Sequence, residues 1–141
     1  MPSPPSSRFL LRARDHADAH YREPLTVADL ARVAHLSPAH FSRAFRRAFG
    51  ESPHQYLLTR RLERAAALLR GTDYAVARIC HAVGLSSVGS FTTSFQRSYG
   101  LTPLEYRATY PPATGLARVP ACVVRAYARQ VRTYGEDTPV R

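Results

Sequence analysis

The sequence predicts an all-α fold, and three observations carry that prediction. Apolar residues recur with the roughly 3.6-residue period of helices rather than the two-residue period of strands. Residues that favour helix starts and stops punctuate these stretches, with serine or threonine before them and glycine after them. A pattern of helix, tight turn and second helix then occurs twice along the chain. Together these observations indicate two copies of one helical unit.

The first quarter of the chain contains a lead-in followed by two predicted helices. Residues 1–7, rich in proline and serine, are expected to be disordered, and a helical period then runs from Arg8 to Tyr21. The apolar face of this first helix comprises Leu10, Ala13, Ala17 and Tyr21. Thr26 and Asp29 have the spacing of a capping box, in which each side chain accepts a hydrogen bond from the other residue's backbone amide. This pair therefore opens a short second helix.

A tight turn at His35-Leu36 separates that helix from the next one. Ser37 is a favourable N-cap and Pro38 a favourable first helical residue, while Gly50 provides a left-handed stop. The expected buried face of this third helix comprises Phe41, Ala44, Phe45 and Ala48. A longer helix follows over about residues 52–70, opened by a serine-proline pair and closed by a glycine.

The second half of the chain repeats this organisation. With one extra residue accommodated near Gly89, residues match those found fifty positions earlier. The matched pairs are Phe41 and Phe91, Phe45 and Phe95, Arg47 and Arg97, Gly50 and Gly100, Ser52-Pro53 and Thr102-Pro103, and Tyr56 and Tyr106. Upstream, at a separation of 49, the pairs are Val27 and Val76, Leu30 and Ile79, Ala31 and Cys80, and Ala34 and Val83. The repeat predicts helix-turn-helix units over about residues 26–50 and 75–100. The expected buried face of the second helix in the second unit comprises Phe91, Phe95 and Ser98.

A helix-turn-helix unit presents its second helix to the major groove of DNA, so the residues outside that helix's buried face are candidate contacts. In the first unit they are Ala39, Ser42, Arg43, Arg46 and Arg47. In the second unit they are Val88, Gly89, Thr92, Thr93, Gln96 and Arg97. Arginine can bond to guanine and glutamine to adenine, whereas threonine can contact thymine methyls or only phosphates. The more basic first unit is therefore expected to be the stronger reader.

The predicted long helix sets the spacing of the two units. About 18 helical residues span roughly 27 Å, which with the flanking turns can hold two recognition helices about one DNA turn apart. One chain could then read two successive major-groove segments, which predicts a monomer on DNA. The arginines along this helix either approach DNA or are solvated residues that pair with Glu63. They are Arg60, Arg61, Arg64 and Arg70.

The charge balance favours a polyanionic partner. Twenty basic and ten acidic residues give a formal net charge of +10, and every basic residue is an arginine. The planar guanidinium suits phosphates and guanine edges, although a GC-rich genome would produce the same bias. Two alternatives to specific DNA binding remain: a non-specific architectural nucleic-acid binder driven by charge, and a protein-binding regulator that has lost DNA specificity.

No catalytic pattern occurs in the sequence. It lacks a glycine-rich nucleotide-binding loop, a nucleophile elbow and paired carboxylates, so neither enzymatic activity nor a cofactor is expected. His16 and His20 have the spacing of a metal pair beside Asp15, but a zinc-protease glutamate is absent, and surface or core histidines without metal are expected. Cys80 and Cys122 are too far apart for a cysteine zinc motif, and Cys122 is interpreted as a structural thiol in preference to a redox sensor.

The two ends of the chain carry little pattern. The N-terminal stretch has only a short apolar run, and no run approaches the roughly 18 apolar residues that cross a bilayer. The sequence therefore predicts a soluble cytoplasmic protein without a membrane partner. Residues 111–141 are interpreted as a linker and C-terminal tail, with a short helix expected from Pro120 to Tyr134.

From about Arg8 to Tyr110 the chain resembles the DNA-binding domain of the AraC/XylS regulators. The first-half motifs are Leu30-Ala31, Leu36-Ser37-Pro38, Phe41 to Phe45, Gly50 to Pro53 and Tyr56 to Leu62. The second-half motifs are Gly84 to Ser87 and Phe91 to Arg107. The resemblance implies seven helices within an 8–110 domain and sequence-specific binding to promoter DNA, commonly with activation through contacts to RNA polymerase.

By motif position, the resemblance places base contacts at Ala39, Ser42 and Arg43, and at Val88, Gly89, Thr92 and Thr93. The chain departs from the family pattern at Cys80, where alanine is usual, and at Leu85, where phenylalanine is usual. It also has Thr93 in place of a common arginine, and Gly89 lacks a side chain that often reads DNA. Most members carry a separate sensor domain. This chain is therefore expected to be either a stand-alone regulator or one controlled through its short tail.

Overall fold

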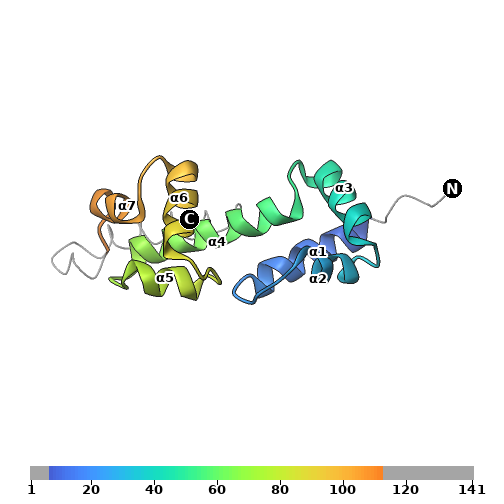
Figure 1. The fold of residues 1–141 in the computed structure, drawn as a ribbon, viewed down its shortest axis with the longest axis horizontal. Coiled ribbons are helices and arrows are strands. Elements are labelled where there is room, and N and C mark those ends of the chain that lie inside the picture. Colours follow the sequence, from blue (N-terminus) through green and yellow to red (C-terminus); the bar gives the residue numbers. More distant parts are fainter. Residues whose placement is uncertain (1–6, 113–141) are drawn as a thin grey trace, which may run out of the picture. The chain divides into compact units, whose positions relative to one another are not determined.

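The computed structural model describes residues 7–112, and this part of the chain consists of α-helices without a β-strand (Figure 1). Its helices are α1 (Ser7–His20), α2 (Val27–Val33), α3 (Pro38–Phe49), α4 (Pro53–Gly71), α5 (Val76–Ala82), α6 (Val88–Tyr99) and α7 (Pro103–Thr109). The all-α prediction is confirmed, and the predicted helices agree with the observed ones within one or two residues. The helix expected from Pro120 to Tyr134 lies outside the described residues.

The chain divides into two compact units, and the division falls inside α4. The first unit ends at Thr59 and the second begins at Arg60. The first contains α1, α2, α3 and the start of α4, whereas the second contains the rest of α4 with α5, α6 and α7. Each unit thus holds one helix-turn-helix pair, α2–α3 or α5–α6.

The first unit packs α1, α2 and α3 around one apolar core. Leu10, Ala13 and Ala17 are buried, as the helical period predicts, and Tyr21 packs partly buried against them. Two contacts join other helices to α1. The Tyr56 hydroxyl of α4 donates a 2.7 Å hydrogen bond to Asp18. The ring of Phe49 in α3 lies 4.9 Å from the guanidinium carbon of Arg14. The apolar core and these contacts orient α3 within the unit.

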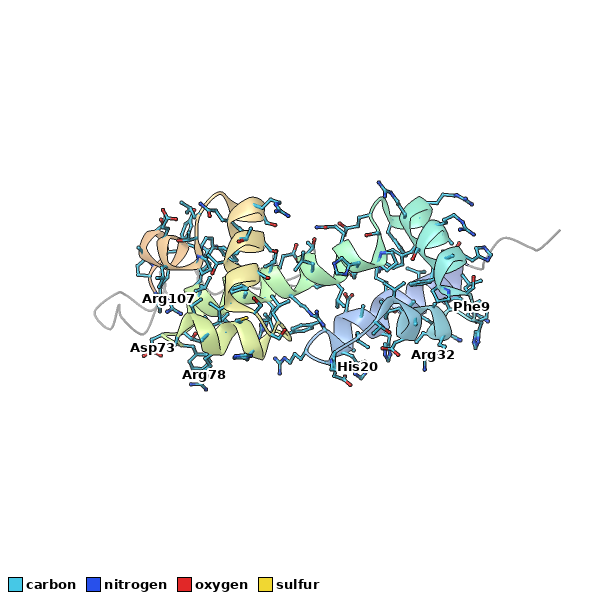
Figure 2. All side chains as sticks on the ribbon, in the orientation of Figure 1. Phe9, His20, Arg32, Asp73, Arg78 and Arg107 are labelled. Atoms are coloured by element: carbon cyan, nitrogen blue, oxygen red, sulfur yellow. The ribbon has the colours of Figure 1, made fainter. Side chains whose placement is uncertain are left out.

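The second unit buries the equivalent residues of the repeat. Its fully buried side chains include Leu62, Leu69, Ile79, Cys80, Val83, Phe91 and Phe95. Helix α6 contacts both α5 and α7. Arg107 of α7 donates a 2.5 Å hydrogen bond to the Tyr74 carbonyl, and Arg78 of α5 stacks over the same tyrosine ring at 3.6 Å (Figure 2). These contacts fasten α7 to the segment that leads into α5.

The two tight turns have the same hydrogen bonds but different residues. The His35 amide bonds to the Arg32 carbonyl, and the following amide bonds to the carbonyl five residues before it. Gly84 and its successor make the same two bonds in the second unit, which is the Schellman pattern at a helix C-terminus. Both central residues are left-handed, with φ of 58° at His35 and 86° at Gly84. A residue other than glycine is uncommon in this left-handed conformation. The His35 ring packs edge-on against the Phe9 ring, with centroids 5.1 Å apart.

Within residues 7–112, none of the helices is both long and apolar enough to cross a membrane.

Candidate nucleic-acid interface

Capping residues and a column of aromatic rings hold α3 in place. The Ser37 hydroxyl accepts a hydrogen bond from the His40 amide, and Gly50 closes the helix in a left-handed conformation with φ of 83°. Phe41 and Phe45 are fully buried. The ring of Phe45 lies 5.5 Å from Phe41, 4.6 Å from Phe49 and 5.5 Å from Tyr56. These rings leave the opposite side of α3 uncovered.

The buried face of α3 differs from the prediction at its last turn. Ala48 was expected to be buried but is exposed, while Phe49 packs partly buried against the core. The core stripe follows positions 41, 45 and 49, because residues four apart lie above one another on a helix. The ring of Phe49 contacts Arg14 of α1, and the neighbouring Ala48 lies outside this stripe.

The predicted contact residues of α3 lie on its accessible side. Ala39, Arg43, Arg46 and Arg47 are exposed, and Ser42 is partly buried. Positions 39, 42, 43 and 46 follow the i, i+3, i+4, i+7 spacing of one helix face, so they form one continuous stripe. The guanidiniums of this stripe can reach the phosphates, guanine O6 and guanine N7 of a groove into which α3 inserts.

Helix α6 is built in the same way. The Ser87 hydroxyl accepts a hydrogen bond from the Ser90 amide, and Gly100 ends the helix with φ of 75°. The ring of Phe95 lies 5.8 Å from Phe91, 4.5 Å from Tyr99 and 5.3 Å from Tyr106. The aromatic column of the first unit therefore recurs ring for ring fifty residues later.

The prediction for α6 is also wrong at its last turn. Ser98 was expected on the buried face but is exposed, whereas the neighbouring Tyr99 is partly buried and stacked on Phe95. Ser98 corresponds to Ala48, and both errors have the same cause: the aromatic residue one position later continues the buried stripe.

The accessible side of α6 carries fewer charges than that of α3. Its exposed residues are Val88, Gly89, Thr93, Gln96 and Arg97, with Thr92 partly buried. Arg97 is the one charged residue in this set, against three arginines in the α3 set. The hydroxyl of Thr93 donates a 3.1 Å hydrogen bond to the Gly89 carbonyl one turn earlier. The two helices are thus held by equivalent caps and aromatic rings, but they expose side chains of different charge and polarity.

The arginines of α4 are less accessible than those of α3. Arg70 is 7% exposed, and its guanidinium carbon lies 4.7 Å from the Tyr110 ring centroid. Arg60 and Glu63 form a 3.7 Å ion pair in which both side chains are largely buried. Burial also lowers the pKa of Arg61 from its ordinary value. These side chains are buried or partly buried and are weaker candidates for DNA contact than the exposed arginines of α3.

Histidines and cysteines form no recognisable site in the described part of the chain. The rings of His16 and His20 lie 4.4 Å apart, and His20 Nδ1 contacts the carboxylate of Glu23. No group of three or more histidine, cysteine, aspartate or glutamate residues with metal-binding geometry occurs in residues 7–112. Burial raises the pKa of the Cys80 thiol, which disfavours the reactive thiolate. Cys122 lies outside the described residues.

Sequence reasoning missed one cluster of the second unit, formed by Tyr74, Arg78 and Arg107. The repeat contained the signal, because the equivalent residues of the first unit are Leu25, Asp29 and Leu57. Two leucines and an aspartate are thus replaced by a tyrosine and two arginines. A side-by-side comparison of the repeats at non-matching positions would have shown these coordinated differences.

Comparisons with known proteins agree with this geometry. A family described as a helix-turn-helix domain matches residues 30–109, which is more than half of the chain. A transcriptional regulator from Chromobacterium violaceum, described as having an AraC-type DNA-binding domain, superposes with a TM-score of 0.68. It is 32% identical over a region that covers 74% of this chain and 93% of that one. The chain belongs to the AraC family of transcriptional regulators.

Other AraC-family similarities cover the same region. The DNA-binding domain of AdpA, solved in complex with a target DNA, is 34% identical, with a TM-score of 0.69 over 77% of this chain and 94% of that one. The probable transcriptional regulator LumQ of Photobacterium leiognathi is 32% identical over 66% of this chain. The activator RclR of Escherichia coli is 40% identical over 58% of it. The chain spans 38% of the length of LumQ and 29% of that of RclR. This AraC-family chain thus contains a DNA-binding domain of the AraC type.

Proposed function

We propose that this AraC-family chain binds double-stranded promoter DNA sequence-specifically, with α3 and α6 as its recognition helices. The observation that carries the proposal is the repeated construction of these helices. Each has a serine N-cap, a left-handed glycine stop and an aromatic column on one side, which leaves the other side accessible. The complex of the AdpA domain with its target DNA supports double-stranded DNA as the ligand.

In α3, Arg43 and Arg46 are the proposed base readers. Both are exposed, and each fork can form two hydrogen bonds to the O6 and N7 atoms of one guanine. Ser42 contacts a base or phosphate beside them. Arg47, near the C-terminal end of the helix, is assigned to the DNA backbone. Ala39 lies in the first turn, where its small side chain permits close approach.

In α6, the proposed contacts give weaker discrimination. Gln96 is exposed and can bond to both N6 and N7 of an adenine. Arg97 corresponds to Arg47 and is assigned to a phosphate. The first unit, with three arginines on its accessible side, therefore supplies most of the base discrimination.

The chain is proposed to act as a monomer on DNA, with residues 8–110 as the DNA-binding domain and 111–141 as a linker and tail. Each of the two units contains one recognition helix, so a single chain supplies both of the helices that would read DNA. Activation through RNA polymerase is the proposed mode of regulation, as the family resemblance implies.

Selection from a random duplex pool at about 150 mM salt tests specific binding, because charge-driven binding is already weak there. Two enriched motifs about 10 base pairs apart would support the proposal. Uniform recovery of sequences with a steep salt dependence would instead indicate an architectural nucleic-acid binder. Weak binding with a shallow salt dependence would indicate a protein-directed regulator.

A further inference from the structure

The accessible side of α6 carries no charge in its first two turns, and its exposed residues there include one large apolar side chain. Val88, at the first helical position, is 37% exposed. Arg43 of the first unit corresponds to Thr93 here, so a cation is replaced by a methyl-bearing residue. Within this stretch of α6, from Val88 to Thr93, no side chain is charged.

The hydroxyl of Thr93 is already engaged within the helix. Its Oγ1 donates to the Gly89 carbonyl at 3.1 Å, which uses the single proton that the hydroxyl can donate. The γ-methyl group and the lone pairs of Oγ1 are the parts of this exposed side chain left for an external partner. Thr93 therefore offers apolar contact but no hydrogen-bond donor.

Gly89 leaves open space between Val88 and Thr93. A Cβ atom built at this position would meet only the Ser87 hydroxyl oxygen, at 4.0 Å, and the residue lacks the positive φ that would require glycine. A glycine inside a helix costs about 0.5–1 kcal/mol relative to alanine. The fold does not require this glycine, and the open space allows a partner to approach the helix backbone closely here.

We infer that α6 reads thymine through its C5-methyl group, with Val88 and Thr93 as the apolar contacts and Gly89 as the gap that admits the base edge. Thymine is the one standard DNA base with a methyl group in the major groove, so apolar contact there identifies it. The inference rests on the proposed role of α6 as a recognition helix. It assigns the two half-sites different chemistry: guanine-centred for α3 and thymine-centred for α6.

Replacement of thymine by uracil in the selected duplex tests the inference, because the exchange removes the methyl group and retains the hydrogen-bonding pattern. Uracil in the half-site bound by α6 should weaken binding about threefold to fivefold per contacted methyl, the effect of exposing roughly one buried methylene. Uracil in the other half-site should change the affinity less than about twofold. Equal affinity for thymine and uracil in the α6 half-site would overturn the inference even if the two-part motif is found. Failure to select any two-part motif would overturn the proposed function and the inference together.

Thr93→Ser is the matching protein variant, because it keeps the hydroxyl and removes the methyl group. It should reduce the thymine-to-uracil ratio toward one while leaving affinity for the uracil duplex nearly unchanged. Thr109→Ser in α7 is the control, since Thr109 makes the same hydroxyl-to-carbonyl bond, to Glu105 at 3.0 Å, on a different helix. Thermal unfolding of both variants verifies that the fold is kept. Equal weakening of thymine and uracil duplexes by Thr93→Ser would show that the Thr93 methyl group does not contact the thymine methyl group, and would overturn the inference.

Discussion

Replacement of Arg43 by alanine should abolish discrimination at one or two base pairs of the α3 half-site. Arg43 is exposed on the continuous stripe of α3, and alanine retains the helix propensity, so the substitution leaves the core and the caps untouched. A bidentate arginine–guanine contact contributes about 1–3 kcal/mol of discrimination, which corresponds to roughly a 5-fold to 150-fold loss of preference for guanine at that position.

The assay is a competition experiment in which each base pair of the selected duplex is varied in turn for the wild type and for Arg43→Ala. Arg22→Ala removes the same charge from an exposed residue beside Tyr21, outside the helix-turn-helix pair, and serves as the control. The control should lower affinity slightly and evenly across all duplexes. If Arg43→Ala also lowered every duplex evenly and reduced the salt slope by about one, Arg43 would be a phosphate contact and its assignment as a base reader would be refuted.

Three further predictions concern the caps and the exposed glycine. Thr26→Ala should destabilise the protein by about 1 kcal/mol, because it removes the N-cap of α2. Ala75→Thr should stabilise it by up to a similar amount, because Ala75 is the N-cap of α5 and makes no side-chain cap hydrogen bond. Chemical denaturation measures both effects, and an unchanged stability of Thr26→Ala would contradict the assignment of Thr26 as a stabilising cap. The capping-box hydrogen bonds lower the pKa of Asp29 below its ordinary 3.8, so the stability that it contributes is present above that value and is lost as the pH falls through the lowered pKa. Asp29→Asn should flatten this part of the acid unfolding profile, and an unchanged profile would show that the carboxylate contributes nothing. Gly89→Ala should raise the free energy of unfolding by up to about 1 kcal/mol, since the added methyl meets open space, and a loss of stability on thermal unfolding would disprove that reasoning.

The sequence predicted the helices well because their ends carry explicit local signals. Thr26 and Asp29 form the expected capping box, and Ser37 and Gly50 form the expected cap and stop. These interactions lie within four residues along the chain, so their geometry follows from spacing alone. The internal repeat extended the same signals to the second half.

Burial at the helix ends depended on tertiary packing and was less predictable. Ala48 and Phe49 both fit a helical apolar stripe, and the choice between them depends on tertiary contacts such as that of the Phe49 ring with Arg14 of α1. Arg70 is also buried through a partner distant in sequence, Tyr110. A periodic pattern contains no information about such partners.

The central claim, that α3 and α6 are both base-reading helices, is tested most directly by grafting one onto the other. A variant with Gly89→Ala, Thr92→Ser, Thr93→Arg and Gln96→Arg gives α6 the outward residues of α3, and all four positions are exposed or only partly buried. Selection of duplexes from a random pool should then return the α3 half-site twice, as a direct repeat at the wild-type spacing. An α6 half-site unchanged from that of the wild type, with the grafted protein folded, would contradict the assignment of α6 as a recognition helix.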